Sequence, residues 1–241
     1  GGKVVWTVHN RQPHHGRMPR MNGYLRRLWA RLPHRLHVHC REAVAIMAPF
    51  LGVPAERFVV AAHPEFPTQP IPPDRARREL IRRGYLPQRT LEYAPWFLMF
   101  GAIAPYKGIA EVMEMFREAT PGRLLLVVGA PKREAGEYLT RLHRLCREHR
   151  HIRLIPRHIP ETEVPLFLSA ADYVVFNYRE VLTSGGAELA RGYGKTLILP
   201  RKGCLKEWQG DNILFFDTPA ELKALLLSAD SPQSLHGRKN R

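Results

Sequence analysis

The chain has 241 residues, enough for one or two domains, and its hydrophobic share of 44% favours a packed globular protein over a disordered one. No apolar run approaches the roughly 20 residues that span a bilayer. The 37 Lys and Arg residues outnumber the 22 Asp and Glu residues, which gives a formal net charge of +15. This charge favours anionic partners, namely nucleotide phosphates, anionic lipid or nucleic acid, unless arginine is simply the preferred surface charge.

The cysteines Cys40, Cys146 and Cys204 are odd in number and far apart in the chain. They predict neither a disulfide framework nor a metal-binding Cys-x-x-Cys pair, and a reducing cytoplasm is the simplest compartment for them. The chain begins with neither a methionine nor a signal-peptide pattern, and it enters directly on a strand-like run. We therefore expect a piece of sequence to be missing upstream.

Short apolar runs rich in β-branched and aromatic residues alternate with helix-length segments. The predicted strands are 4–8, 36–39, 58–61, 96–100, 124–128, 152–155, 173–176, 197–199 and 213–216. The predicted helices between them are 42–51, 74–83, 109–119, 134–150, 161–170 and 184–193. Several strands are apolar at consecutive positions, as strands buried on both faces must be. The alternation predicts an α/β fold with parallel, doubly wound sheets.

A proline-rich segment, 63–73, interrupts this rhythm. With the helix that follows, it leads to the strand at 96, where six strands begin in regular succession. We predict two domains: a partial Rossmann-like domain with its linker at 1–90, and a nearly complete Rossmann-like domain at 91–241. The first holds only three predicted strands, against a usual five or six in a sheet.

Ligands of open parallel sheets bind at the carboxyl ends of the strands, which directs attention to three loops. These loops carry Gly101 to Gly108 with Lys107 among them, Gly129 to Lys132, and the run Thr183, Ser184, Gly185 and Gly186. Glycine lets a ligand approach the backbone amides, and the start of a helix favours an anion such as pyrophosphate. Lys107 would add a mobile positive charge for the same phosphates.

Four short motifs, taken in their order along the chain, resemble those of a known protein family. They are Tyr106-Lys107-Gly108, then Ala171-Asp172, then Glu180-x7-Glu188, then Gly194 before a strand. In this order and spacing the chain resembles the retaining GT-B glycosyltransferases of family four, and within them members with "TVHN", "YKG" and "LTSG" signatures, often found in exopolysaccharide gene sets. The likeness runs from Thr7 to about Phe216, although each motif alone is a weak signal.

The resemblance implies a GT-B fold of two Rossmann-like domains, the N-terminal one incomplete. It implies transfer of a hexose, with retention, from a UDP- or GDP-linked sugar to a glycan or a lipid-linked acceptor. GT-B enzymes generally need no metal, so neither a metal nor another cofactor is expected. The expected location is the cytoplasm.

The resemblance also implies roles for individual residues. Glu180 would lie near the donor sugar and Glu188 would bind the ribose hydroxyls, since a carboxylate can accept two hydroxyl protons. His9 would contact the sugar from the opposite domain. Lys107 and the amides of Ser184–Gly186 would stabilise the departing diphosphate, and Gly129 and Thr183 would complete the donor site. Without the other motifs, Glu180 would be a solvated loop acid, Glu188 an acid favoured by the helix dipole, and His9 structural.

One position departs from the pattern. Similar sequences carry an arginine in the loop before the lysine, often as "IRPYKG", whereas this chain has Ala104. Lys132 in the neighbouring loop would be the remaining candidate for a second cation. On the expectation that residue 104 faces the donor cleft, Ala104→Arg should strengthen donor binding. His63 resembles the histidine of a "PHG" linker motif, but Pro64 follows it, which favours a structural role at the hinge.

Other histidines raise the alternative of a metal site. His14 and His15 are adjacent, and His37 and His39 share one face of a predicted strand. No carboxylate or cysteine completes a ligand set at a recognisable spacing, so a metal is not expected.

Residues 19–32 form a predicted basic amphipathic helix. Met21, Leu25, Leu28 and Leu32 make one apolar stripe, and Arg26, Arg27 and Arg31 are interleaved with it. Such a helix could lie on an anionic membrane, which would place the protein at the inner face of the plasma membrane. Alternatively, the stripe packs on the sheet and the arginines are solvated.

Two other functions stay open. The substitution at Ala104 and the incomplete first domain would also suit a non-catalytic GT-B remnant that binds nucleotide or a protein partner. The net charge of +15 would suit a nucleic-acid-binding protein. Because no reader motif or aromatic-basic platform is recognisable, nucleic acid is not among the expected partners.

Overall fold

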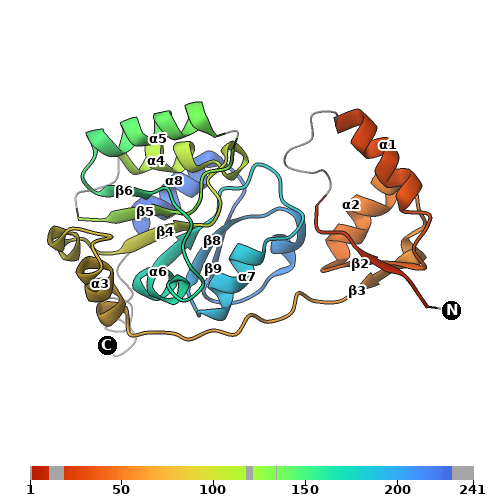
Figure 1. The fold of residues 1–241 in the computed structure, drawn as a ribbon, viewed down its shortest axis with the longest axis horizontal. Helices are drawn as coiled ribbons and strands as arrows, with labels where there is room; N and C mark the ends of the chain where they lie inside the picture. The colour runs from red at the N-terminus through yellow and green to blue at the C-terminus, as the bar shows by residue number, and fades with distance from the viewer. Residues whose placement is uncertain (1, 11–18, 118–121, 134, 230–241) are drawn as a thin grey trace. The chain divides into compact units, whose positions relative to one another are not determined.

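The computed structural model describes residues 2–10, 19–117, 122–133 and 135–229. Its contacts divide the chain into two compact units, each with its own parallel sheet (Figure 1). Unit 1 consists of Gly1–Pro64, Glu180–Gly185 and Arg201–Gln209, and unit 2 of Glu65–Arg179, Gly186–Pro200 and Gly210–Arg241. The predicted α/β class is confirmed, and each of the nine predicted strands is present to within one or two residues.

Unit 1 has a three-stranded sheet with one helix-covered face. The strands, in the order β1-β2-β3, are β1 (Val5–Thr7), β2 (Arg35–Val38) and β3 (Phe58–Val60), all parallel. Helix α2 (Arg41–Leu51) contributes Ala43, Met47 and Leu51 to a buried cluster with Leu36 and Val38. Side chains on the other face, such as Val5 and Val59, are about half exposed (56% and 45%).

Helix α1 (Pro19–Trp29) turns its predicted apolar stripe to solvent. Met21, Leu25, Leu28 and Leu32 are all exposed, by 39% to 79%. The opposite side carries the fully buried Ala30 and the half-buried Arg26, which donates to the Asn10 carbonyl at 2.7 Å and lies 5.5 Å from the Trp6 ring centroid. The alternative prediction, that the stripe packs on the sheet while all the arginines are solvated, is therefore wrong. A cation over an aromatic ring offsets part of the cost of burying this arginine.

Cys40 and Cys204 form a disulfide within unit 1, with a Cα–Cα distance of 5.4 Å. The prediction of unpaired cysteines is thus wrong for these two, whereas Cys146 is free. The partners are 164 positions apart in sequence, so only the fold brings them together. No local spacing could have indicated the pair.

Unit 2 has a six-stranded parallel sheet in the order β6-β5-β4-β7-β8-β9. Its strands are β4 (Trp96–Phe100), β5 (Leu124–Val128), β6 (Ile152–Ile155), β7 (Tyr173–Val175), β8 (Thr196–Pro200) and β9 (Ile213–Phe216). Every residue of β5 is buried, as its unbroken Leu-Val run requires for a strand covered on both faces.

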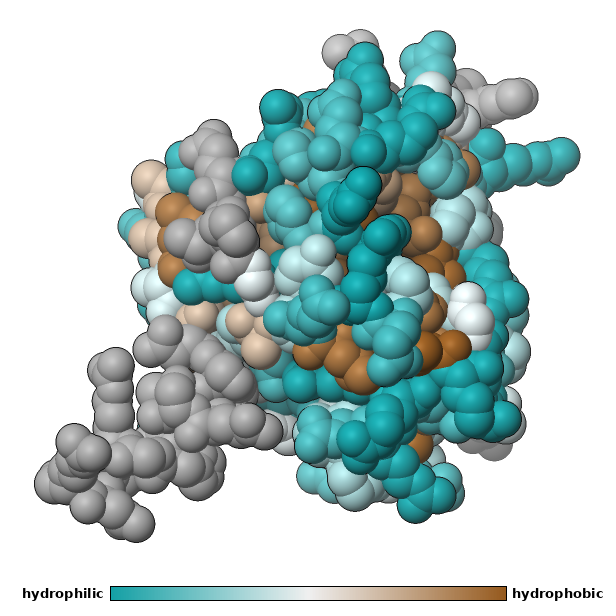
Figure 2. All heavy atoms as spheres, turned by 90° about the vertical axis from the view of Figure 1, so that its left-hand side faces the viewer, coloured by the Kyte–Doolittle hydropathy of each residue, from teal (hydrophilic) through white to brown (hydrophobic). Residues whose placement is uncertain are grey.

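Helices cover both faces of this sheet (Figure 1). Figure 1 shows α4 (Ile109–Arg117), α5 (Gly136–Glu148) and α8 (Pro219–Ser228) on one face, and α3 (Pro73–Arg82), α6 (Val164–Ala170) and α7 (Gly185–Gly192) on the other. Phe97 and Phe116 meet edge to face in the core of the first layer, with ring centroids 5.3 Å apart. In Figure 2, hydrophilic side chains predominate on the face shown, in keeping with the many charged residues.

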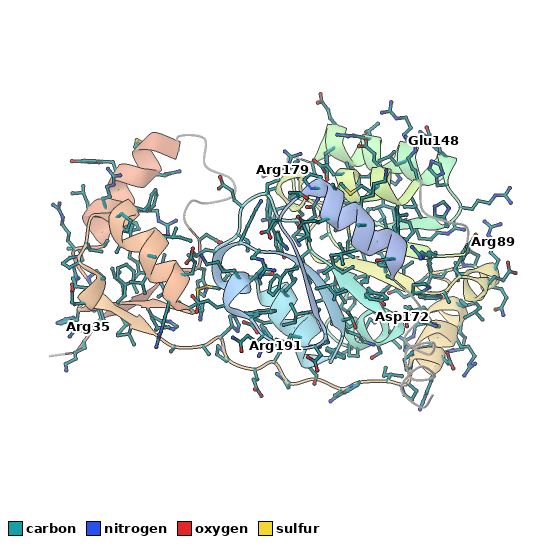
Figure 3. All side chains as sticks on the ribbon, turned by 180° about the vertical axis from the view of Figure 1, so that it is seen from behind. Arg35, Arg89, Glu148, Asp172, Arg179 and Arg191 are labelled. Atoms are coloured by element: carbon teal, nitrogen blue, oxygen red, sulfur yellow. A yellow bond between two sulfur atoms is a disulfide. The ribbon has the colours of Figure 1, made fainter. Side chains whose placement is uncertain are left out.

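Helix α3 belongs to unit 2, so the division falls between Pro64 and Glu65 and differs from the predicted boundary at residues 90 and 91. Arg77 of α3 forms a 2.7 Å ion pair with Asp172, which is labelled in Figure 3 and precedes β7; both side chains are 12% exposed. Arg77 also donates to the Ala170 carbonyl at 3.0 Å. Leu80 of α3 is fully buried. The helix is thus fixed to α6 and β7, although it precedes them by about 90 residues in the chain.

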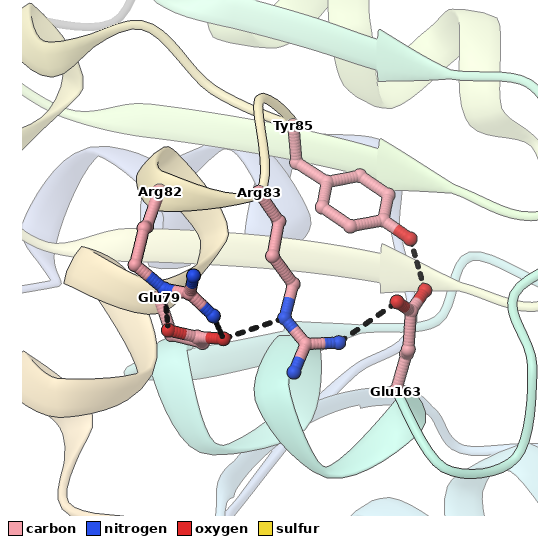
Figure 4. Close-up of polar contacts among 5 residues, drawn as sticks. All are labelled: Glu79, Arg82, Arg83, Tyr85 and Glu163. Carbon is pink, nitrogen blue, oxygen red and sulfur yellow. Dashed lines mark hydrogen bonds and ion pairs between the residues drawn. The ribbon is translucent and has the colours of Figure 1, made fainter.

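A polar network extends this attachment (Figure 4). Glu79 accepts from Arg82 and Arg83, and Arg83 also pairs with Glu163 at 2.9 Å. The Tyr85 hydroxyl donates to the same Glu163 carboxylate. These contacts explain why a proline-rich segment that looks like a linker is followed by a helix that is not part of it.

Helix α8 was absent from the sequence prediction. Thr218 caps it, because its hydroxyl accepts from the Glu221 N–H at 3.2 Å, while the Glu221 carboxylate accepts from the Asp217 N–H at 2.8 Å. The Thr-Pro-Ala-Glu run that makes these bonds is close to a capping-box signature and was readable in the sequence. Among the described helices, none combines the length and apolar character needed to cross a bilayer.

Candidate functional site

The strand order of unit 2 defines where a ligand can bind. From β4 the chain moves outward to β5 and β6, and from β7 it moves to β8 and β9 on the other side, so β4 and β7 flank the point where the order reverses. Crevices at the carboxyl ends of such strands hold ligands in open α/β sheets. A pocket of roughly 230 Å³, counting its opening to solvent, lies here and is lined by Gly101, Lys107, Asn177 and Tyr178.

Lys107 folds back over the end of β4. It ends the short 3-10 helix η3 (Pro105–Lys107), and its Nζ lies 3.4 Å from the Phe100 carbonyl and 5.8 Å from the Tyr178 ring centroid. Gly101 has φ +103°, and a Cβ there would lie 2.9 Å from that Nζ. Glycine at 101 thus provides both the backbone conformation and the room for the lysine.

Burial and, to a smaller extent, the nearby charge of Lys132 together lower the pKa of Lys107 to about 8. A positive charge held in this pocket is therefore disfavoured until an anion joins it. Lys132 sits on the neighbouring loop, whose backbone is joined to the Lys107 loop: the Lys132 N–H donates to the Ile103 carbonyl at 3.0 Å. Two lysines near each other give the pocket the electrostatics of an anion site.

Two further glycines of this region have a packing role. Gly129 has φ +150°, and a Cβ there would lie 2.0 Å from the Gly101 carbonyl oxygen. Gly108 has φ +60°, and a Cβ there would lie 2.5 Å from Asn177 Nδ2, which donates to the Gly108 carbonyl at 3.0 Å. The loops after β4, β5 and β7 can pack this closely only because glycine occupies these positions.

Asn177 is a pocket residue that the sequence reasoning missed. A polar residue directly after the buried strand β7 was the available signal. Its neighbour Tyr178 is buried and stacks on Tyr106 with the rings 12° from parallel and the centroids 6.3 Å apart. The Arg179 N–H, one residue further, donates to the Tyr106 carbonyl at 2.9 Å. The Tyr-Lys-Gly turn and the end of β7 thus hold each other in place.

The Glu-x7-Glu stretch divides between the units. Glu180 is exposed and Ser184 is buried, and both belong to unit 1 together with Thr183 and Gly185. Gly186 and Glu188 belong to unit 2, where the Glu188 carboxylate lies 3.9 Å from Arg191 on the next turn of α7. The structure therefore places Lys107, Gly129, Gly186 and Glu188 on unit 2.

Ala104 does not face the open pocket. It is 1% exposed, in an extended backbone conformation with φ −154°. The expectation that a side chain at this position points into the donor cleft is contradicted, because an arginine here would have to displace packed neighbours. Lys132 remains the candidate for a second cation.

His9 belongs to unit 1 and is exposed at the carboxyl end of β1. Its Nδ1 lies 3.4 Å from Nε2 of His39, and the His39 ring centroid lies 4.8 Å from that of His37 and 4.9 Å from that of His63. The pKa of His39 is lowered by burial and by the neighbouring histidines. His37 contacts Thr7 Oγ1 and the Ala61 carbonyl through its two ring nitrogens.

These four histidines gather where three parallel strands end. Among the described residues, no group of three or more His, Cys, Asp or Glu side chains has the arrangement needed to hold a metal ion. The predicted alternative pair, His14 and His15, lies outside the described residues.

Solved structures identify the class of fold. No protein-family model matches the chain. The HepE protein of Anabaena, solved with UDP and glucose, aligns with a TM-score of 0.76 at 15% identity, covering 93% of this chain and 61% of that one. Sucrose-phosphate synthase of Thermosynechococcus elongatus aligns with a TM-score of 0.72 at 17% identity, covering 91% and 56%. The chain thus has the GT-B fold of glycosyltransferases, which confirms the resemblance predicted from the sequence.

Sequence comparison adds a relative with a named activity. The GDP-mannose:glycolipid 4-beta-D-mannosyltransferase of Xanthomonas campestris pv. campestris is 25% identical over 203 residues. The match covers 83% of this chain and 50% of the relative. The chain therefore spans about half the length of the curated relatives it matches.

Proposed function

We propose that this chain carries the donor-binding machinery of a glycosyltransferase that moves a hexose from a nucleoside diphosphate sugar to a glycan or lipid-linked acceptor, with retention. The observation that carries the proposal is Lys107, a largely buried lysine with a lowered pKa in a pocket at the reversal point of a parallel sheet. A diphosphate is an anion of the right kind to offset that charge. The relatives named above include one named for GDP-mannose and one solved with UDP.

The proposed chemistry is electrostatic. As the bond between the anomeric carbon and the diphosphate oxygen breaks, negative charge builds on the departing diphosphate. Lys107, Lys132 and the amides of Ser184–Gly186 at the start of α7 stabilise that charge. Glu188 binds the ribose hydroxyls, and Glu180 and His9 position the donor sugar, as the resemblance implies. No metal is needed in this scheme, because the two lysines supply the positive charge.

The proposed acceptor is a lipid-linked glycan at an anionic membrane surface. Tyr24, Trp29 and Leu32 are between 62% and 79% exposed on or just after α1, and Arg27 and Arg31 are exposed among them. Apolar side chains flanked by arginines suit the interface of a bilayer with negative headgroups. The relative from Xanthomonas is named for a glycolipid acceptor. This attachment would be peripheral, on the cytoplasmic face.

Calorimetric titration with GDP, UDP, GDP-mannose and UDP-glucose tests the donor site. We expect the diphosphates to bind and Lys107→Ala to weaken them by about 1.5–3 kcal/mol, the scale of a hydrogen bond to a charged group. Arg89→Ala is the matched control, because it removes an exposed cation ahead of β4, at the other end of that strand. Equal losses in the two variants, or no binding by the unaltered protein, would contradict the proposal.

Two alternatives give different results in the same experiments. A non-catalytic remnant binds the diphosphates but transfers no labelled sugar to lipid extracts. A nucleic-acid-binding protein binds single-stranded oligonucleotides more tightly than diphosphates, with a steep salt dependence. The acceptor is tested by transfer assays with and without anionic vesicles.

A further inference from the structure

The segment between β8 and β9 leaves the sheet of unit 2 and belongs to unit 1. It comprises Arg201–Gln209 and contains a short 3-10 helix, Gly203–Glu207. Gly203, Cys204 and Leu205 are buried. We call Arg201–Gln209 the return segment.

The return segment is fastened to the start of α2. Cys204 is disulfide-bonded to Cys40, the residue that caps α2 by accepting from the Ala43 N–H at 3.2 Å. The Glu207 carboxylate accepts from the N–H groups of the first turn, from Arg41 at 3.3 Å and from Glu42 at 2.5 Å. An acid at this end of a helix is favoured by unpaired amides and by the helix dipole.

The same segment supports the stretch predicted to face the donor. The Cys204 N–H donates to the Leu182 carbonyl at 2.8 Å. Gly203 has φ +53°, and a Cβ there would lie 2.3 Å from the Val181 carbonyl oxygen, so only glycine permits the approach. Leu182 is 4% exposed and packs in the apolar cluster that contains Cys40 and Cys204. Thr183 and Ser184 follow directly in the chain.

We propose that the Cys40–Cys204 disulfide is a redox-controlled clamp on the donor loop Glu180–Gly185. When the bond is formed, the return segment holds Val181 and Leu182, and through them the amides that follow, in the binding conformation. When it is reduced, the loop opens more often and nucleotide affinity falls. This proposal rests on the proposed function for its effect on nucleotide, but not for its effect on the loop.

The reaction is a thiol–disulfide exchange. A dithiol reductant attacks one sulfur, the bond between Cys40 Sγ and Cys204 Sγ breaks, and the mixed disulfide is resolved by the second thiol of the reductant. The products are two protein thiols, Cys40 and Cys204, each with one proton, and the oxidised reductant, which is a disulfide. The reverse reaction needs a disulfide oxidant such as oxidised glutathione.

The contacts that survive reduction are weaker than the covalent bond. The Lys206–Glu42 ion pair has side chains that are 41% and 25% exposed, and exposed pairs of this kind contribute little. The apolar cluster around Leu36, Met47 and Leu51 does not depend on the sulfur–sulfur bond, so unit 1 is expected to stay folded. Reduction is therefore expected to loosen the loop without unfolding the protein.

Thiol counting is the first test. Denatured without reductant, the oxidised protein should show one reactive thiol, Cys146, and after dithiothreitol it should show three. Three thiols in protein that has been incubated with oxidised glutathione would overturn the proposal.

Hydrogen exchange is the second test and requires no nucleotide. Amides 181–184 and 202–208 should exchange at least severalfold faster after reduction, while amides of β4 and β5 in unit 2 should not change. The Cys40→Ser/Cys204→Ser double variant should exchange like the reduced protein and should not respond to dithiothreitol. Cys146→Ser, the matched control, should respond like the unaltered protein. Unchanged exchange at 181–184 on reduction would overturn the clamp.

Nucleotide titration is the third test and separates the two proposals. We expect reduction to weaken GDP or UDP binding by about threefold to tenfold, with equal values for the double variant in both states. If the oxidised protein binds neither nucleotide while exchange at 181–184 still responds to reduction, the proposed function fails and the control of the loop stands. Equal affinity in the oxidised and reduced states would show that the disulfide does not control the donor loop.

Discussion

The two sheets of this chain are built from the same alternation of strands and helices, but they are covered to different extents. In unit 2 the central strands β4 and β5 are buried almost throughout, with helices on both faces. In unit 1, Val59 and Val60 of β3 are each 45% exposed. A parallel sheet is normally covered on both faces, so unit 2 resembles a complete domain and unit 1 does not.

This difference explains how each unit supports the loops that it carries. The Lys107 pocket is supported by a continuous core under β4 and β7 and by loops that glycines allow to pack closely. The loop at Glu180–Gly185 contributes only Leu182 to the smaller buried cluster of unit 1. It is supported by a disulfide and by a segment returning from another sheet. Where burial is incomplete, covalent and capping contacts take a larger share of the stabilisation.

The largest expected effect is on stability, and it tests the difference in burial between the two units. Phe116→Ala removes a fully buried ring that meets Phe97 in the core of unit 2, and the free energy of unfolding should fall by about 3–5 kcal/mol. Val59→Ala removes a half-exposed side chain of unit 1 and should change it by about 0.5 kcal/mol or less. Urea denaturation followed by fluorescence measures both. Similar losses in the two variants would mean that the exposed face of unit 1 is covered in solution.

A second substitution tests unit 2 as the nucleotide-binding unit. Glu188→Ala should weaken binding of a nucleoside diphosphate by about 1.5–3 kcal/mol if the carboxylate accepts hydrogen bonds from the ribose hydroxyls. Arg191→Ala removes its ion-pair partner on α7 and serves as control, because the 3.9 Å pair has no role in binding on this scheme. Unchanged affinity of a folded Glu188→Ala variant in calorimetry would remove this residue from the site.

A third substitution concerns the buried position in the pocket loop. Ala104→Arg should destabilise unit 2 by about 1–3 kcal/mol through overpacking, because Ala104 is 1% exposed. Pro105→Ala at the exposed neighbouring position is the control. A variant of unchanged stability with tighter diphosphate binding would restore the expectation drawn from related sequences, that residue 104 faces the donor.

The pH dependence of binding sharpens the role of Lys107. Its pKa is lowered to about 8, so the free protein loses this positive charge as the pH rises through 8, whereas a bound diphosphate favours the charged form. Affinity should therefore be nearly constant below pH 7 as far as this lysine is concerned, and should fall about fivefold, or about 1 kcal/mol, from pH 8 to pH 9. Lys107→Ala should lose that slope. A slope that persists in the variant would assign it to another group.

The smallest expected effect compares two leucines of equal exposure. Leu28 on α1 of unit 1 and Leu91 in unit 2 are both 39% exposed. Leu28→Ala should weaken sedimentation with vesicles containing anionic lipid by about 0.5–1 kcal/mol, since less apolar surface enters the interface. Leu91→Ala should have no effect, and binding by the unaltered protein should fall with salt. Equal binding to neutral and anionic vesicles would argue against a membrane surface on α1.

Much of the fold followed from local pattern. Runs such as Leu124–Val128 are apolar at every position, and only a strand buried on both faces suits them, so their location was predictable. The Thr218 cap of α8 is an equally local signal, although α8 is absent from the predicted elements. The domain boundary was not local, because the ion pair of Arg77 with Asp172, which fixes α3 to unit 2, joins residues far apart in sequence.

Some features of the candidate site were predictable from the sequence and others were not. Lys107 was predicted from its loop, but the lowered pKa depends on burial that no spacing reveals. Helical periodicity located the stripe of α1 and could not say which side faces inward, because the inward side carries Arg26 and Ala30. The disulfide joins residues 164 apart and was beyond any local signal. Non-local pairing and burial are thus what the sequence left open.

The return of the chain to unit 1 also limits how this protein can be taken apart. A recombinant fragment that ends at Pro64 contains all three strands of the smaller sheet but lacks Leu182 and Cys204, two members of its buried cluster. A fragment that begins at Glu65 contains Leu182 and Cys204 but lacks the residues of the N-terminal segment against which they pack. The two units are therefore not interchangeable modules, and a chimera that exchanges one of them with a related chain needs five junctions in place of one.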